Sequence, residues 1–153
     1  MSRLRLGDVF EIPTSEGFAC FQYINSAEQY GSLIRVFSGV HVRSAVDAAD
    51  TNRSDVQFLC FFPVKAAVAM GVVSRIGNAE IPPEYRDFPV FRAGVVNPVS
   101  GKVDHWWFWD GTREWPVGDL TESQRRMPIR GVWNDTLLVE RIESGWRAEL
   151  DSR

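Results

Sequence analysis

The chain has 153 residues, 44% hydrophobic and 24% charged, and its six tryptophans and ten phenylalanines suit one soluble globular domain spanning residues 1–153. Its formal net charge of −3 argues against a nucleic-acid partner, because proteins that bind nucleic acid usually carry a basic surface. No apolar run approaches the roughly 20 residues of a membrane helix or forms a signal peptide, so we expect a cytoplasmic protein with no membrane partner.

Three strand-like segments open the chain and predict an antiparallel meander. Asp8–Ile12 ends at Pro13, and Phe18–Ile24 and Ser32–Phe37 follow it. The segments are rich in aromatic and β-branched residues, and polar turns separate them, which is the usual signature of short paired strands.

Residues 44–55 change character, since they contain no aromatic residue and include Asp47, Asp50 and Asp55. Either a short helix or a surface loop fits this composition, and we favour an exposed connection. Acidic residues of this kind usually form a solvated loop. The alternative is a docking patch for a basic partner, because acidic clusters accelerate encounter with a positively charged surface.

The middle of the chain alternates short elements. Val56–Phe62 is a nearly all-apolar run stopped by Pro63, which predicts a strand covered on both faces. Lys65–Met70 is alanine-rich and predicts a helical turn, and Val72–Ile76 predicts a further short strand. Two consecutive prolines within residues 81–85 predict a loop.

A second meander begins at Pro89–Val96 and continues into the aromatic segment Lys102–Trp109, which ends on Asp110-Gly111. Asp-Gly is typical of a two-residue hairpin turn, because such a turn needs positive φ at its central residues. A two-residue turn fixes the register of the hairpin, with Trp109 facing Thr112.

The two faces of this hairpin differ in chemistry, because side chains alternate along a strand. The face that we expect to be core carries Trp106 opposite Trp115, and also Phe108. The other face mixes tryptophans with charged and imidazole groups, as partner-binding surfaces do. That face carries His105, Trp107, Trp109, Thr112, Glu114 and Pro116. We favour a plainer interpretation, in which another element covers the two tryptophans and leaves His105 and Glu114 at the rim.

Helix signals come late in the chain. Thr121–Gln124 matches a capping box, and Pro128 ends the short helix that it begins. A second helix begins at Asn134 or Asp135 and extends to about Ser144. The predicted fold is therefore α+β and mainly antiparallel β: a strongly bent sheet or partial barrel made from two meanders, with two short helices near the carboxyl terminus.

No catalytic signature accompanies these elements. The sequence contains no nucleophile elbow and no glycine-rich phosphate loop. Cys20 and Cys60 each lie in an apolar run and predict small buried side chains, with a disulfide or a reactive thiol as the alternatives. Together with His41 and His105 they have no metal-site spacing. We therefore expect a protein that is not an enzyme and that holds neither a cofactor nor a metal.

The opening of the chain resembles a known family. Gly7–Pro13, followed by a turn and the aromatic strand Phe18–Ile24, is similar to the start of bacterial immunity proteins of immunity protein family 26. Asp110-Gly111, Val117–Thr121 and the closing leucine-containing segment before Gly145 are also similar in order and spacing. The likeness spans most of the chain, but it does not include the tryptophan-rich hairpin or the acidic insertion of residues 47–55.

The resemblance implies an antidote that is encoded beside a polymorphic toxin and binds it inside the producing cell. Such a protein neutralises its cognate toxin domain by stoichiometric occlusion, without catalysis. A few buried aromatic side chains and complementary charges supply the tight binding that this requires. The candidate partner-binding residues are His105, Trp107, Trp109 and Glu114 on the hairpin, and Asp47, Asp50 and Asp55 in the acidic segment.

The alternative function is a small-ligand or peptide-binding β module that uses the face of Trp107 and Trp109, with His105 beside them. Tryptophan faces suit carbohydrate rings and cations. This alternative requires a concave pocket with Trp107 in its wall.

Overall fold

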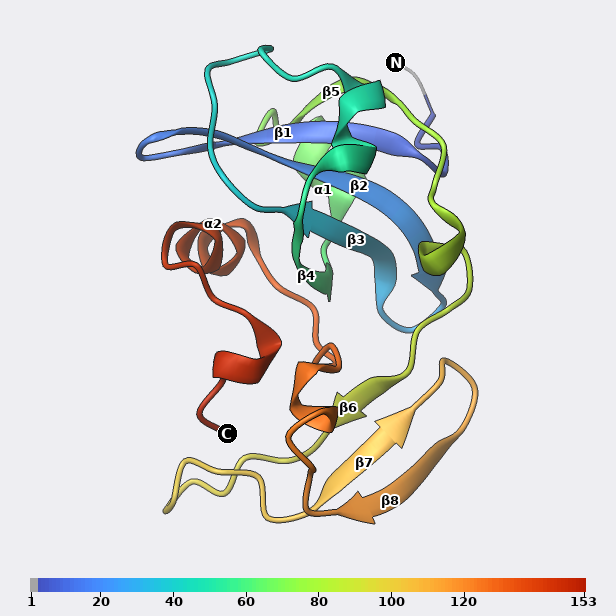
Figure 1. Ribbon diagram of the computed structural model, residues 1–153, viewed down its shortest axis with the longest axis vertical. Helices are drawn as coiled ribbons and strands as arrows, with labels where there is room; N and C mark the ends of the chain where they lie inside the picture. The colour runs from blue at the N-terminus through green and yellow to red at the C-terminus, as the bar shows by residue number, and fades with distance from the viewer. Residues whose placement is uncertain (1–2) are drawn as a thin grey trace.

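A computed structural model describes residues 3–153, which form two antiparallel sheets (Figure 1). The strand order is β4-β3-β2-β1-β5 in the large sheet and β6-β7-β8 in the small sheet. The strands are β1 Asp8–Thr14, β2 Gly17–Ala27, β3 Gly31–Phe37, β4 Val56–Phe61, β5 Ser74–Asn78, β6 Phe91–Ala93, β7 Trp106–Trp109 and β8 Glu114–Gly118.

Helices are few and short, so the prediction of a mainly antiparallel β fold is confirmed. The α-helices are α1 Val64–Ala69 and α2 Asp135–Glu143, and the 3-10 helices are η1 Ala48–Arg53, η2 Pro83–Tyr85, η3 Gln124–Arg126 and η4 Ala148–Leu150. Within residues 3–153 no helix is both long and apolar enough to cross a membrane.

The two predicted meanders are present. Strands β1, β2 and β3 pair in sequence order in the large sheet, and β6, β7 and β8 do so in the small sheet. The large sheet is extended on one side by β4 and on the other by β5, so it remains open at these two edges within the described residues. The first predicted meander extends further than expected, since β1 continues through Pro13 to pair with Phe18.

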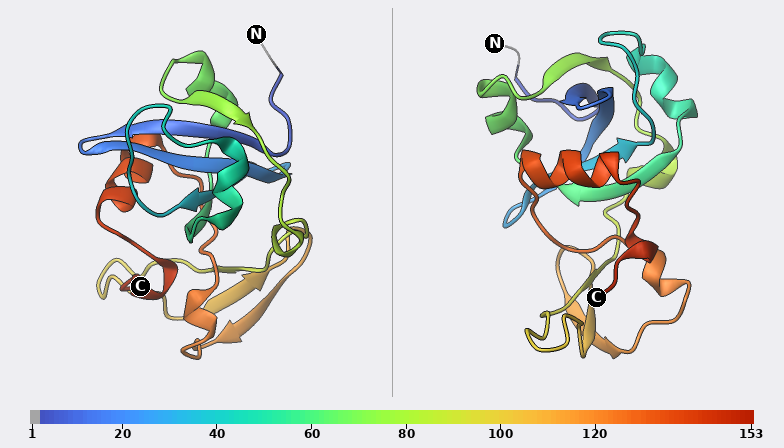
Figure 2. Two further views of the ribbon diagram at one scale, coloured as in Figure 1. Left: turned by 45° about the horizontal axis from the view of Figure 1, so that its top comes forward. Right: turned by 90° about the vertical axis from the view of Figure 1, so that its left-hand side faces the viewer.

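The first core lies on one face of the large sheet. Phe10 and Phe21 stack with ring centroids 5.4 Å apart, and the buried residues Leu138 and Ile142 of α2 pack onto the same cluster (Figure 2). The side chain of Asn134 accepts a hydrogen bond from the backbone N–H of Leu137 at 2.8 Å, which starts α2 where the sequence predicts.

The second core lies between the two sheets and is centred on Phe61. Its ring centroid is 5.2 Å from that of Phe91 in β6 and 6.1 Å from that of Trp109 in β7. Tyr30 and Phe88 complete the cluster against Trp109. Strand β4 therefore presents apolar side chains to both cores, and the prediction that it is covered on both faces is confirmed.

The predicted register of the aromatic hairpin is wrong by two residues. Trp109 faces Glu114 and Phe108 faces Trp115, because the turn has four residues rather than two. The carboxylate of Asp110 accepts hydrogen bonds from the backbone N–H groups of Thr112 and Arg113, at 2.9 and 2.8 Å. These two bonds satisfy backbone donors inside the four-residue loop, and so they favour the longer turn.

A slip of two residues keeps each side chain on its predicted face, but the burial of the faces differs from the prediction. Trp106 and Trp109, predicted on opposite faces, are both buried, whereas Phe108 and Trp115 are only half-buried. A bulge also shifts the pairing of Trp106, which faces Gly118. The face expected to be core is thus largely peripheral, because the large sheet packs on the other face.

Within residues 44–55, the helix alternative is confirmed for residues 48–53, which form the 3-10 helix η1. Asp47 caps η1 by accepting a hydrogen bond from the backbone N–H of Ala49, and the helix buries Ala48 and Thr51. A Cβ atom on Gly77 of β5 would lie 2.7 Å from the Cβ of Ala48, so only glycine permits this close approach. Most of the segment is exposed, as favoured, but Ala48 and Thr51 are buried because one face of η1 packs against β5.

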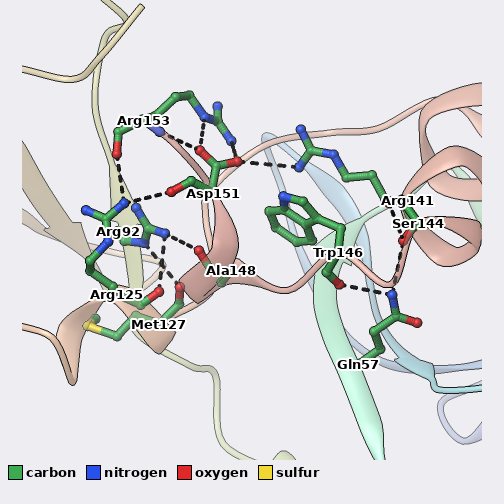
Figure 3. Close-up of polar contacts among 10 residues, drawn as sticks. All are labelled: Gln57, Arg92, Arg125, Met127, Arg141, Ser144, Trp146, Ala148, Asp151 and Arg153. Atoms are coloured by element: carbon green, nitrogen blue, oxygen red, sulfur yellow. Dashed lines mark hydrogen bonds and ion pairs between the residues drawn. The ribbon is translucent and has the colours of Figure 1, made fainter.

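Arg92 of β6 joins the small sheet to the carboxyl-terminal segment (Figure 3). Its guanidinium lies over the ring of Trp106, 4.6 Å from the centroid, and donates to the carbonyl oxygens of Ala148, Arg125 and Met127 at 2.6, 3.2 and 3.4 Å. Burial and the nearby charge of Arg125 lower the pKa of Arg92 to about 10, so the group remains a cation at neutral pH.

Asp151 anchors the same segment (Figure 3). It is 8% exposed, accepts hydrogen bonds from Nε and Nη2 of Arg153 at 2.7 and 2.9 Å, and lies 3.9 Å from Nη1 of Arg141. Burial opposes the ionised form, but the hydrogen bonds of Arg153 and the charges of Arg153 and Arg141 outweigh it. The pKa of Asp151 is therefore lowered to about 2.

This shift predicts a pH dependence of stability. A carboxyl group whose pKa falls on folding stabilises the fold above its unfolded pKa, here 3.8, and loses that contribution as the pH falls to about 2. At pH 7, Asp151→Asn should lower the free energy of unfolding by about 2 kcal/mol, as measured by urea denaturation. The difference from the unchanged protein should shrink towards pH 2, whereas the exposed control Asp87→Asn should have little effect at either pH. A cost that is the same at pH 7 and pH 2 would contradict this account.

Candidate partner-binding site

A cleft of about 600 Å³ opens on the small sheet, and we call it the Trp107 cleft. Trp107 and His105 come from β7 and the residue before it, Glu114 comes from the start of β8, and Arg130 follows η3. The remaining wall is the segment from Ala93 to Pro98, which continues from β6. Four separate parts of the chain therefore meet at this cleft.

A tight loop shapes the wall opposite Trp107. Val96 and Val103 form an isolated antiparallel bridge, and the backbone N–H of Asn97 donates to the carbonyl of Lys102 at 2.7 Å. A Cβ atom on Gly94 would lie 2.3 Å from Cγ1 of Val103, so the loop closes there only with glycine. Because of this loop, Val95 and Val96 line the cleft together with Trp107 and do not pack into either core.

The apolar side chains around the cleft are unusually open to solvent. Among the residues that line it, Trp107 is 39% exposed, Val95 87% and Val96 38%. A contiguous exposed apolar patch on an otherwise polar surface often marks a contact site. A half-exposed tryptophan within such a patch is the residue type most enriched among interface hot spots.

Charged groups surround this apolar centre. Arg130 donates from Nη1 to Oε2 of Glu114 at 2.9 Å, and its guanidinium lies 5.3 Å from the ring centroid of Trp109. Asp104 accepts a hydrogen bond from Nδ2 of Asn97 at 3.0 Å. Because each contact fixes a charged side chain at the rim, the cleft presents two carboxylates and one guanidinium in set positions.

The four hairpin residues expected at a binding surface separate into two groups. His105, Trp107 and Glu114 line the cleft, and its concave shape satisfies the requirement of the ligand-binding alternative. Trp109 is only 6% exposed and belongs to the second core, so the plainer interpretation holds for this residue and its alternative role as a partner contact is corrected. Arg130 was not predicted, since no local pattern connects it with Glu114.

The acidic residues of the other candidate surface have largely structural contacts. Asp47 caps η1, and Asp55 pairs with Arg147 and accepts a hydrogen bond from Ser38 at 2.8 Å. Hydrogen bonds from Arg147 and Ser38 hold the pKa of Asp55 below its ordinary value. Of these three acidic residues, only Asp50 is exposed without a side-chain hydrogen bond or ion pair to another residue from 3 to 153. These residues lie by the large sheet, away from the small sheet that carries the Trp107 cleft (Figure 1).

Both cysteines are free and buried, as the apolar runs around them predict. Burial, together with the charge of Glu11, raises the pKa of Cys20 to about 12, and burial also raises the pKa of Cys60. Sγ of Cys20 lies 3.4 Å from Nε2 of His41, but its high pKa keeps the group a thiol at neutral pH. Over the described part of the chain, no three His, Cys, Asp or Glu side chains are grouped to hold a metal ion.

A scan against models of protein families, a search of curated proteins and a search of solved structures each found no match to this chain.

Proposed function

We propose that this chain is a cytoplasmic, single-domain immunity protein that binds a cognate bacterial toxin domain through the Trp107 cleft and neutralises it by occlusion. The observation that carries the proposal is the half-exposed ring of Trp107, framed by exposed valines and fixed charges. This arrangement supports recognition of a protein surface by an apolar anchor within a polar rim. The toxin as partner rests on the resemblance of the opening strands to immunity protein family 26.

Rigidity supports the same proposal, because an occluding protein must bind without much ordering cost. The second core fixes β7 behind the cleft, and Arg130 connects the rim to Trp109 in that core. We also propose that the large sheet is strongly bent, as a partial barrel around the first core. The bulges in the pairings of β1–β5, β2–β3 and β3–β4 support this bend.

A second candidate function is the binding of a small ligand or a peptide in the same cleft. Its volume of about 600 Å³ is within the range of small-molecule sites. The ring of Trp107 beside Asp104 and Glu114 suits a sugar ring or a cationic side chain.

Co-expression with a toxin domain encoded beside this chain tests the first proposal, with co-purification and cell survival as the measurements. Trp107→Ala should weaken the complex by at least about 30-fold, the loss of a hot-spot residue. Trp115→Ala is the matched control, because this half-buried tryptophan lies outside the cleft. Asp50→Ala tests the acidic surface and should leave protection unchanged.

The possible results separate the proposals. Full protection by the Trp107→Ala variant would exclude the cleft as the toxin-binding surface. The absence of a complex with every neighbouring toxin domain would exclude the immunity function. Saturable binding of a monosaccharide or short cationic peptide, lost in the same variant, would then establish the second candidate.

A further inference from the structure

A second cavity, of about 800 Å³, opens at the end of the first core, and we call it the Arg3 cavity. It lies between the amino-terminal segment, β1, α1 and β5 of the large sheet, and is therefore separate from the Trp107 cleft of the small sheet. Leu4, Phe10 and Val68 form an apolar floor that is continuous with the first core. The volume lies within the range of sites for small organic ligands.

Three cationic side chains surround this floor: Arg3, Lys65 and Arg75. Arg3 and Lys65 are exposed and form no ion pair or side-chain hydrogen bond with any other residue from 3 to 153. Arg75 uses its Nε to donate to Asp8 at 2.9 Å, and the described contacts engage neither of its terminal nitrogens. The chain as a whole has a net charge of −3, whereas the rim of this cavity carries three positive charges.

Asp8 does not cancel this positive charge. Its carboxylate is buried and is already occupied by Nε of Arg75, the backbone N–H of Arg5 and Nδ2 of Asn78. Burial opposes its ionised form, but these hydrogen bonds outweigh burial and hold the pKa of Asp8 below its ordinary value. Asp8 therefore positions Arg75 at the cavity while leaving its terminal nitrogens available to an anion.

We propose that the Arg3 cavity binds a small amphipathic anion. The carboxylate, sulfate or phosphate group of the ligand contacts Arg3, Lys65 and Arg75, and its apolar body lies over Phe10 and Val68. An apolar floor with a cationic rim is complementary to this class of compound, because apolar burial and charge-assisted hydrogen bonds act on opposite ends of one molecule.

Calorimetric titration of the full chain with octanoate, 1-octanol and octylammonium tests the proposal, since these probes share one chain length and differ in charge. Octanoate should bind at least about tenfold more tightly than octanol, the difference expected from a charge-assisted hydrogen bond. Octylammonium should bind more weakly than either. Octyl phosphate and octyl sulfate then identify the preferred head group.

Variants assign the binding to this cavity. Arg3→Gln combined with Lys65→Gln should reduce the preference for octanoate over octanol, leaving only the part that Arg75 supplies, whereas Arg53→Gln, which removes an exposed arginine outside the cavity, should not change it. Val68→Trp should fill the cavity and abolish binding of both probes, with the melting temperature verifying that each variant is folded. Equal affinity for octanoate and octanol, no binding of either, or a preference that the double substitution leaves unchanged would each overturn the proposal.

Binding to membranes is a separate outcome of the same experiment. Association with phosphatidylglycerol vesicles in the absence of octanoate binding would overturn the small-molecule proposal and indicate a surface for lipid head groups instead. Because the Trp107→Ala variant leaves the Arg3 cavity intact, failure of the immunity function does not affect this test.

Discussion

Trp109→Ala should lower the free energy of unfolding by about 3–5 kcal/mol, the range for truncation of a buried aromatic side chain. Trp109 is 6% exposed, and its ring contacts Tyr30, Phe88 and Phe91 with centroids 5.0, 5.4 and 5.5 Å away. Its loss leaves a void between the two sheets that the surrounding rings fill only in part. Urea denaturation followed by circular dichroism measures the change.

Trp107→Ala is the matched control for this prediction, since it removes the same side chain two residues earlier on the same strand. Trp107 is 39% exposed and stands at the cleft, so its removal should cost about 1 kcal/mol or less. Trp109→Ala should therefore lower stability, whereas Trp107→Ala should weaken partner binding and leave stability nearly unchanged. Equal destabilisation by both would contradict the assignment of Trp109 to the core and of Trp107 to the surface.

Arg92→Ala should also be strongly destabilising, by about 3–5 kcal/mol, because it leaves the carbonyl oxygens of Ala148, Arg125 and Met127 without their buried donor. It also uncovers the ring of Trp106, which the guanidinium covers. Since Ala93 and Gly94 follow Arg92 directly and line the Trp107 cleft, the same variant should weaken binding of the partner. Urea denaturation and co-purification measure these two effects.

Two further substitutions test the cause of the loss at Arg92. Arg92→Met keeps much of the side-chain volume without the donors, and it should lose most of the same stability. Arg86→Ala removes an exposed arginine that pairs with Glu80, and such surface pairs contribute about 1 kcal/mol or less. An Arg92→Met variant as stable as the unchanged protein would mean that burial of the charge offsets all three hydrogen bonds.

Local signals predicted the elements that depend on near neighbours in the chain. The reciprocal hydrogen bonds between Thr121 and Gln124 form the predicted capping box, although the helix that follows is a short 3-10 turn. The hairpin register failed for an equally local reason, since the Asp110 carboxylate favours a longer turn than Asp-Gly usually forms. A turn motif alone did not reveal which backbone donors that carboxylate would accept.

The sequence by itself determined the two meanders, the buried cysteines and the helix at Asn134, because alternation, apolar runs and caps act over a few residues. Only the tertiary structure decided that Trp109 is core and Trp107 is surface, although both lie on one predicted face. The difference is made by Phe61, which reaches Trp109 from a distant strand. The hydrogen bond from Arg130 to Glu114 likewise depends on packing between segments that are distant in the sequence, and no local pattern predicts such packing.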